Sequence, residues 1–121
     1  MAIGRFLNRT IDLNKINLWD LPHVEHSRIY WEGRKRKPFS AFHEKLPDEI
    51  KTKVLTFLRS GVEWSACPGI LTDDVTGNSL PIQWLNYTDG VYSWNSKTTY
   101  QFAKYDMKLP DDFIDHILKQ V

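Results

Sequence analysis

The sequence predicts an α+β fold, in which a small antiparallel sheet containing an Asp-Gly hairpin packs against two or three helices. Three observations support this prediction. The Asp-Gly pair at 89–90 stands between alternating aromatic residues, a pattern typical of a β-hairpin. Two segments, KLPDEI at 45–50 and KLPDDF at 108–113, combine proline with carboxylates as helix N-termini do. The length of 121 residues fits a single domain that spans positions 1–121.

The strands and loops follow from residue type. Residues 1–27 give no assignable period, because their apolar residues are irregularly spaced. Aromatic and β-branched residues then predict four strands, at 28–32, 62–66, 81–87 and 91–95. Between the second and third strands, a long loop is expected at 68–80, and it contains Asp73, Asp74, Gly77 and Asn78.

Three helices are expected. The first follows residue 47 and ends near Ser60 and Gly61, and its inward residues are Ile50, Val54, Phe57 and Leu58. Ser96 is the expected N-cap of a second helix over 97–105, whose inward residues are Tyr100, Ala103 and Phe102. The third follows residue 110, and its apolar stripe consists of Phe113, Ile114, Ile117, Leu118 and Val121.

A two-residue turn at Asp89 and Gly90 fixes the expected register of the hairpin. This turn pairs Thr88 with Val91 and requires a positive φ at Gly90. One face of the hairpin, which we expect to be buried, then carries Leu85, Tyr87, Tyr92 and Trp94.

Composition indicates a folded, soluble protein, since 41% of the residues are hydrophobic and five Trp, five Tyr and six Phe provide surface for a core. The single cysteine, Cys67, excludes an internal disulfide and a multi-cysteine zinc site, and we expect it to be half-buried. The chain shows neither a signal-peptide apolar region nor an apolar run of the ~20 residues that a membrane span needs. A cytoplasmic protein without a membrane partner is therefore expected.

The net charge of +1 is unevenly distributed. Residues 1–60 carry 12 Lys/Arg and 7 Asp/Glu, whereas residues 61–121 carry 4 and 8. The densest basic run, GRKRK at 33–37, lies beside Tyr30, Trp31 and Phe39, a pattern compatible with phosphate binding and base stacking. A solvated turn between strands is the favoured interpretation, because no recognised RNA- or DNA-binding motif accompanies the run. Nucleic acid is therefore not an expected partner.

Neither a catalytic site nor a metal site is expected. The four histidines, which lack the spacing of a metal motif, are His23, His26, His43 and His116. The chain also lacks a glycine-rich phosphate loop and a nucleophile elbow, and the start of a helix explains the acidic pair at 111–112. These features predict a protein that is not an enzyme and holds no cofactor.

The C-terminal third carries a more specific pattern. TDGVYSW at 88–94, a tyrosine-bearing helix and KLPDDFIDHI at 108–117 resemble a group of small bacterial proteins. That group has the pattern Thr-Asp-Gly-x-aromatic-x-Trp, followed by Leu-Pro-x-x-Phe-Ile/Val-x-His-Ile/Val. Its members are similar to immunity proteins of polymorphic and contact-dependent growth inhibition toxin systems. The matching positions are Thr88, Asp89, Gly90, Tyr92, Trp94, Tyr100, Leu109, Pro110, Phe113, Ile114, His116 and Ile117.

The resemblance implies a protein that binds one cognate toxin domain and occludes its active site. Such toxins are often nucleases with basic clefts, against which an acidic surface can imitate phosphate. The expected partner-binding residues are the loop acids Asp73 and Asp74 and the exposed aromatic Trp84. The alternative is another non-enzymatic interaction module, an adaptor or a subunit of a homo-oligomer that uses the same aromatic side chains. The sequence assigns no oligomeric state.

Overall fold

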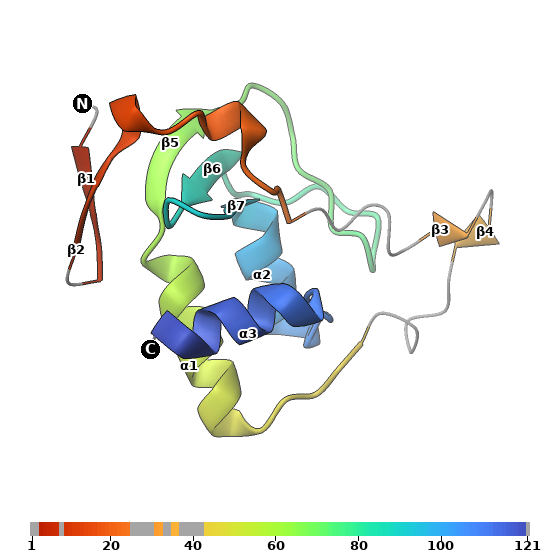
Figure 1. Ribbon diagram of the computed structural model, residues 1–121. Coiled ribbons are helices and arrows are strands. Elements are labelled where there is room, and N and C mark those ends of the chain that lie inside the picture. The colour runs from red at the N-terminus through yellow and green to blue at the C-terminus, as the bar shows by residue number, and fades with distance from the viewer. Residues whose placement is uncertain (1–2, 8, 25–30, 33–34, 37–42, 121) are drawn as a thin grey trace.

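The computed structural model describes residues 3–7, 9–24, 31–32, 35–36 and 43–120. The α+β prediction is confirmed, because three helices pack on one side of an antiparallel sheet with the strand order β5-β6-β7 (Figure 1). The sheet consists of β5 (Val62–Ala66), β6 (Leu85–Thr88) and β7 (Ser93–Asn95). The helices are α1 (Asp48–Arg59), α2 (Ser96–Tyr105) and α3 (Asp111–Gln120).

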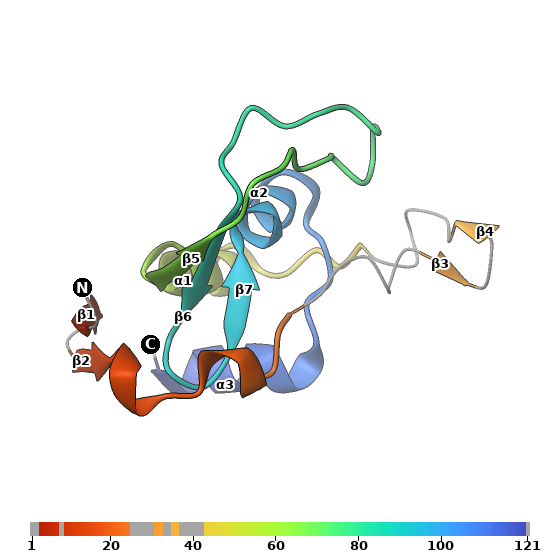
Figure 2. The same ribbon diagram turned by 90° about the horizontal axis from the view of Figure 1, so that it is seen from above.

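An N-terminal segment crosses the other side of the sheet, as Figures 1 and 2 show. It contains two short 3-10 helices, η1 (Leu13–Lys15) and η2 (Leu18–Asp20). After η2 the backbone joins the edge of β7: the Val24 N–H donates to the Ser93 carbonyl at 2.8 Å, and the Ser93 N–H donates to the Pro22 carbonyl at 2.9 Å. The sheet therefore has helices on one face and part of the N-terminal segment on the other.

Two further strand pairs flank this body. The first, β1 (Ile3–Phe6) with β2 (Arg9–Asp12), is antiparallel, and its Phe6 ring lies 4.9 Å from Phe57 of α1 in an edge-to-face contact. The second, β3 (Trp31–Glu32) with β4 (Lys35–Arg36), is also antiparallel and lies away from the sheet in Figure 1. The basic run thus contributes Lys35–Arg36 to a strand, while its other members, 33, 34 and 37, lie outside the described residues.

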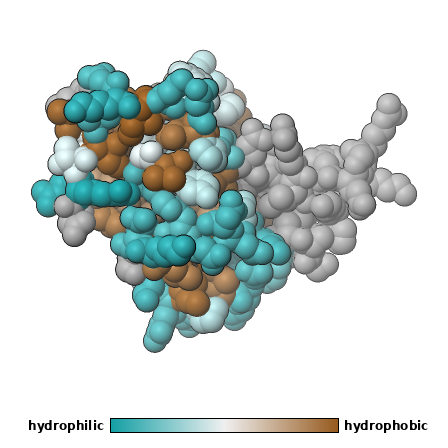
Figure 3. Space-filling model, viewed as in Figure 1, coloured by the Kyte–Doolittle hydropathy of each residue, from teal (hydrophilic) through white to brown (hydrophobic). Residues whose placement is uncertain are grey.

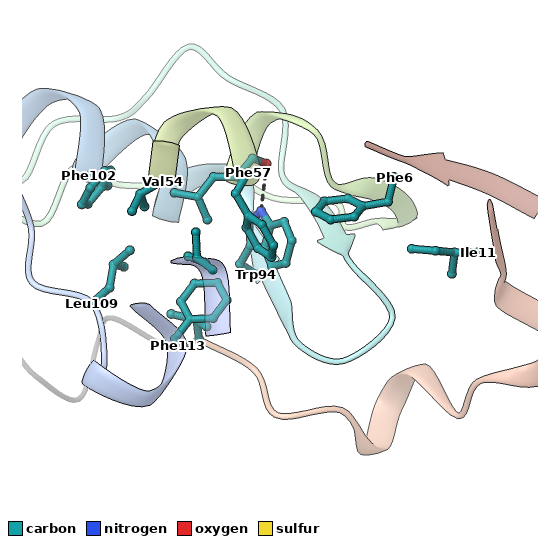
Figure 4. Packing of buried hydrophobic residues seen from close by; sticks show 11 residues of the cluster. Phe6, Ile11, Val54, Phe57, Trp94, Phe102, Leu109 and Phe113 are labelled. Atoms are coloured by element: carbon teal, nitrogen blue, oxygen red, sulfur yellow. Dashed lines mark hydrogen bonds between the residues drawn. The ribbon is translucent and has the colours of Figure 1, made fainter. Parts of the chain in front are cut away.

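The core lies between the sheet and the three helices (Figure 4). Trp94 of β7 is fully buried, and its indole N–H donates to the Leu58 carbonyl at 3.1 Å. Its ring packs against Phe57 at 5.3 Å and Phe113 at 5.8 Å between centroids. The remaining buried members of this cluster are Phe6, Ile11, Val24, Val54, Leu58, Phe102, Leu109 and Ile117. One aromatic side chain from the hairpin thus joins α1 to α3.

The predicted first and third helices are confirmed by α1 and α3. Val54, Phe57 and Leu58 of α1 are buried, and Ser60 caps its C-terminus, as expected. In α3, Phe113 and Ile117 are buried, whereas Val121 of the expected stripe lies outside the described residues. The opposite side of α3 exposes three acids, Asp111, Asp112 and Asp115, and the helix forms a hydrophilic band in Figure 3.

The second helix differs from the prediction at its start. Asn95, not Ser96, is the N-cap, because its side-chain oxygen accepts the Thr98 N–H at 3.1 Å. The Ser96 hydroxyl instead donates to the Gln83 carbonyl at 2.6 Å and accepts from the Leu85 N–H. Phe102 is buried as expected, but Tyr100 and Ala103 are only half-buried. The other buried positions of α2 are Thr98 and Gln101.

The hairpin forms, but its predicted register and two-residue turn are wrong. Tyr87 pairs with Trp94 and Thr88 with Ser93, so residues 89–92 form a longer loop. The Asp89 carboxylate explains the difference, because its Oδ1 accepts the N–H groups of residues 91 and 92 at 3.1 and 2.8 Å and so closes the loop within itself. The positive φ at Gly90 is confirmed at +96°.

The prediction of which hairpin side chains share the buried face is confirmed in part, because moving the register by two residues leaves each side chain on the same face of the sheet. Trp94 and Tyr87 remain on the helix side, whereas Tyr92 belongs to the loop and packs on Phe113 at 4.9 Å. Strand boundaries also change: β5 matches its prediction, but β6 begins at Leu85 and β7 at Ser93. Of the first predicted strand, positions 28–30 lie outside the described residues.

Candidate functional site

The face of the sheet opposite the helices carries a pocket of about 250 Å³. Side chains from β5, β6 and β7 form its floor, and the segment around η2 forms one wall. Three tryptophans dominate the lining, and we call this region the tryptophan pocket. Its lining residues are Leu18, Trp19, Leu21, His23, Trp64, Cys67, Trp84, Asn86 and Ser93.

Trp19 projects from η2 and is 79% exposed, the highest value among the exposed large hydrophobic residues of the described chain. Its ring meets Trp64 edge to face, with centroids 5.0 Å apart and planes at 87°. Trp64 is half-buried and held in place, because its indole N–H donates to the Ser93 hydroxyl at 3.2 Å. One ring is therefore fixed to the sheet, while its neighbour presents most of its surface to solvent.

Trp84, the expected exposed aromatic, is half-buried. Its carbonyl accepts the Cys67 N–H at 2.9 Å, and the chain beyond Cys67 runs past its ring, since a Cβ at Gly69 would lie 3.7 Å from Trp84 Cε3. The next residue, Ile70, is 74% exposed. Ile70 therefore adds exposed apolar surface close in the chain to Cys67 of the pocket, although it is not itself a lining residue.

The polar atoms of the pocket floor are engaged within the protein. The Ser93 hydroxyl, in addition to its bond from Trp64, lies 3.2 Å from His23 Nδ1. The Asn86 side-chain amide donates to the Ser65 hydroxyl at 2.8 Å and to Cys67 Sγ at 3.4 Å. Ser93 is 1% exposed, so its hydroxyl is not presented to an incoming substrate. What the pocket offers to a partner is apolar ring surface.

The expectation that Asp73 is an exposed loop acid is wrong, because the residue is 2% exposed. Its Oδ1 accepts the N–H groups of Val75 and Thr76 at 2.8 and 3.0 Å, and its Oδ2 accepts the Tyr105 hydroxyl at 2.6 Å. Burial alone would raise the pKa of Asp73, but these hydrogen bonds and the charge of Lys104 together lower it. This carboxylate organises its own loop and joins it to α2.

Asp74 is likewise occupied within the protein. Its Oδ1 lies 2.7 Å from Lys97 Nζ, its Oδ2 accepts from Gln101 Nε2, and its own N–H donates to Gln101 Oε1 at 2.8 Å. Reversing the charge of Asp73 and Asp74 would therefore disturb folding, contrary to the expectation for a free loop. The exposed acids of the C-terminal half are instead Glu63 on β5 and positions 111, 112 and 115 on α3.

Sequence reasoning thus found one residue of the tryptophan pocket, Trp84, and missed Trp19 and Trp64. Trp64 could have been found, because it lies in the predicted strand 62–66, where the alternation of side chains between the two faces of a sheet assigns it a face. Trp19 offered no such signal, since it stands in a three-residue 3-10 helix. Among the described residues, no group of three or more metal-binding side chains gathers, and no helix is long and apolar enough to cross a membrane.

Comparisons with models of protein families, with curated proteins and with solved structures each gave no match for this chain.

Proposed function

We propose that this protein is an immunity protein that binds one toxin domain and blocks it by covering its active site. The observation that carries the proposal is the exposed ring of Trp19 at the mouth of the tryptophan pocket. Tryptophan is the residue most typical of binding hot spots, which lie beside well-packed pockets at the centre of an interface. An exposed ring braced by a fixed neighbour offers contact area that loses little freedom on binding.

The proposal of a toxin domain as the partner comes from the resemblance of the C-terminal third to immunity proteins. In the structure the resembling segments form one unit, since Asp89 contacts His116 and Tyr92 packs on Phe113. Most of the shared residues therefore hold the scaffold together, and binding falls to residues outside the motif. The nuclease activity of the toxin rests on the resemblance alone, because Asp73 and Asp74 are engaged inside the protein.

No catalytic step belongs to this proposal. Inhibition requires tight binding, for which roughly 1,600 Å² of total buried surface is the usual scale. The tryptophan pocket would form only the centre of such an interface. Trp19 and Ile70 would make its anchors, with the polar residues around them excluding water.

The test begins with the neighbouring gene. An immunity gene is expected directly downstream of a gene for a large protein with a toxin domain. That domain, expressed and purified, should bind the wild-type protein and should no longer arrest growth when the two are co-expressed. Trp19→Ala should weaken binding by a factor of about 30 or more, as loss of a hot-spot residue does.

Val91→Ala is the matched control, because Val91 is also an exposed apolar residue, at 45%, and does not line the tryptophan pocket. It should leave the affinity unchanged. A toxin domain that binds wild type and Trp19→Ala equally would remove this face from the interface. If wild type instead sediments as a dimer that Trp19→Ala dissociates, the homo-oligomer alternative is correct.

A further inference from the structure

A second pocket, of about 400 Å³, lies on the helix side of the sheet and shares no residue with the tryptophan pocket. It opens between the end of α1, the chain entering β6 and the first turns of α2. Its lining residues are Leu58, Arg59, Ile82, Gln83, Leu85, Tyr87, Ser96, Thr99 and Tyr100. This volume falls within the range of small-molecule sites, roughly 300–1,000 Å³, whereas the tryptophan pocket is below it.

The lining combines an apolar surface with a few polar groups. Ile82 and Leu85, both half-buried, provide apolar surface, whereas Leu58 is 1% exposed and adds almost none. Arg59 is the one charged residue among the nine described lining residues. An apolar pocket with a small number of directed polar groups is the usual composition of a ligand site.

Some polar groups of the pocket already make hydrogen bonds within the protein, and others do not. The Ser96 hydroxyl and the Tyr100 hydroxyl are engaged, by the Gln83 carbonyl and by Lys104 Nζ at 3.0 Å. The Arg59 guanidinium and the Tyr87 hydroxyl make no hydrogen bond or ion pair with any residue that the structure describes. The side chains of Gln83 and Thr99 make none with the described residues either, so four lining side chains that can donate a hydrogen bond, one of them cationic, are available beside the apolar surface.

The charges around the pocket restrict the ligand further. Lys104 adds positive charge beside Tyr100, whereas Glu63 pairs with Tyr87 across β5 and β6 and acts on it electrostatically. Burial, followed by the charge of Glu63, raises the pKa of Tyr87, so its hydroxyl remains a donor at neutral pH. A second anionic group near Glu63 would be repelled, which favours a ligand with a single negative charge.

From this arrangement we infer that the pocket binds a small monocarboxylate with an apolar body, its carboxylate against Arg59 and its body on Ile82 and Leu85. Arginine suits this role because its planar guanidinium matches a carboxylate with two parallel hydrogen bonds. The inference is independent of the proposed function, since it concerns another face and needs no toxin.

The probe is indole-3-acetate, with the uncharged indole-3-acetamide as its matched analogue. Binding is measured by calorimetry and by shifts in the ¹H–¹⁵N spectrum. We expect the carboxylate to bind with a Kd of about 0.1–1 mM, a range suited to a ligand of this size, and to shift the amide signals of Tyr87, Thr99 and Tyr100. The amide analogue should bind about fivefold more weakly or worse.

Arg59→Gln should lower the affinity for indole-3-acetate about fivefold or more and leave that for the amide unchanged. Lys53→Gln is the control, because Lys53 is an exposed cation on α1 that does not line the pocket. Unchanged dispersion of the spectrum verifies that each variant is folded. The inference is overturned if indole-3-acetate does not bind at 5 mM, on the order of five times that Kd, if the amide binds equally well, or if both variants lose affinity alike.

Discussion

His116 of α3 and Asp89 of the hairpin loop are in direct contact, with Nε2 and Oδ2 2.5 Å apart. Asp89 is 1% exposed, and its other oxygen accepts two backbone N–H groups of its own loop. The His116 ring also lies against Tyr92 and Phe57, at 4.9 and 5.9 Å between centroids. The contact therefore joins the loop to the C-terminal helix, 27 residues away, across the aromatic core.

Removing this contact should destabilise the protein. We expect His116→Ala to lower the free energy of unfolding by about 2–3 kcal/mol, because it leaves a buried carboxylate with one partner fewer and opens space beside two rings. Asp115→Ala, one position earlier on the exposed side of α3, should change it by no more than about 0.5 kcal/mol. Urea unfolding of both variants gives the comparison, and equal losses would show that His116 makes no special contribution.

Trp94 should be among the most costly core residues to truncate. Trp94→Ala removes a fully buried ring and its hydrogen bond to Leu58, and losses of about 3–5 kcal/mol are typical of such changes. Phe113→Ala should cost a similar amount, since that ring contacts both Trp94 and Phe57. Trp19→Ala serves as the reference, because its ring is 79% exposed. If truncation of Trp94 and Trp19 were equally mild in thermal unfolding, the packing described for the core would be wrong.

Local signals explain which parts of the fold could be predicted from the sequence. The starts of α1 and α3 depend on proline and on carboxylates within the first turn, and their apolar stripes repeat every turn. These features act over a few residues, so tertiary contacts did not overrule them. By contrast, the Asp89 carboxylate accepts backbone N–H groups of its own loop. These hydrogen bonds stabilise a four-residue loop, so the strands pair in a different register from the one that a two-residue turn imposes.

The candidate site depended more on distant contacts. Asp73 appeared to be a loop acid, but its hydroxyl donor, Tyr105, lies 32 residues away. The sequence Asp73-Asp74-Val75-Thr76-Gly77 did contain a usable signal, since an aspartate that begins such a turn often accepts the backbone N–H groups two and three residues later. Trp19 had no comparable signal, because a single 3-10 turn is too short to show a hydrophobic period.

Two glycines should respond differently to substitution. Gly90 has a φ of +96°, but the nearest side-chain atoms to an added Cβ would be 3.7 Å away, so Gly90→Ala meets backbone strain alone. We expect a loss of about 1–2 kcal/mol. At Gly61 an added Cβ would lie 2.6 Å from Trp94 Cζ2 and 2.8 Å from Tyr87 Cβ, so Gly61→Ala must displace the core and should cost more. Denaturant unfolding decides the order, and a Gly61→Ala variant as stable as wild type would contradict this close approach.

The pH dependence of stability should report on Asp73. Its pKa in the folded protein is held below its ordinary value, so the folded state binds its proton less readily than the unfolded state does. The resulting stabilisation is complete above about pH 5, and it is lost as the pH falls through the folded pKa. Asp73→Asn should therefore lower the free energy of unfolding at pH 7 and should flatten its decline under acidic conditions.

Tyr105→Phe provides the intermediate case, because it removes one hydrogen bond to Asp73 and leaves the two from Val75 and Thr76. We expect a loss of about 1–2 kcal/mol at pH 7, with the acid-side decline reduced but still present. Urea unfolding at pH 3, 5 and 7 separates the three proteins. Parallel curves for wild type and Asp73→Asn would mean that this carboxylate does not stabilise the fold through its charge.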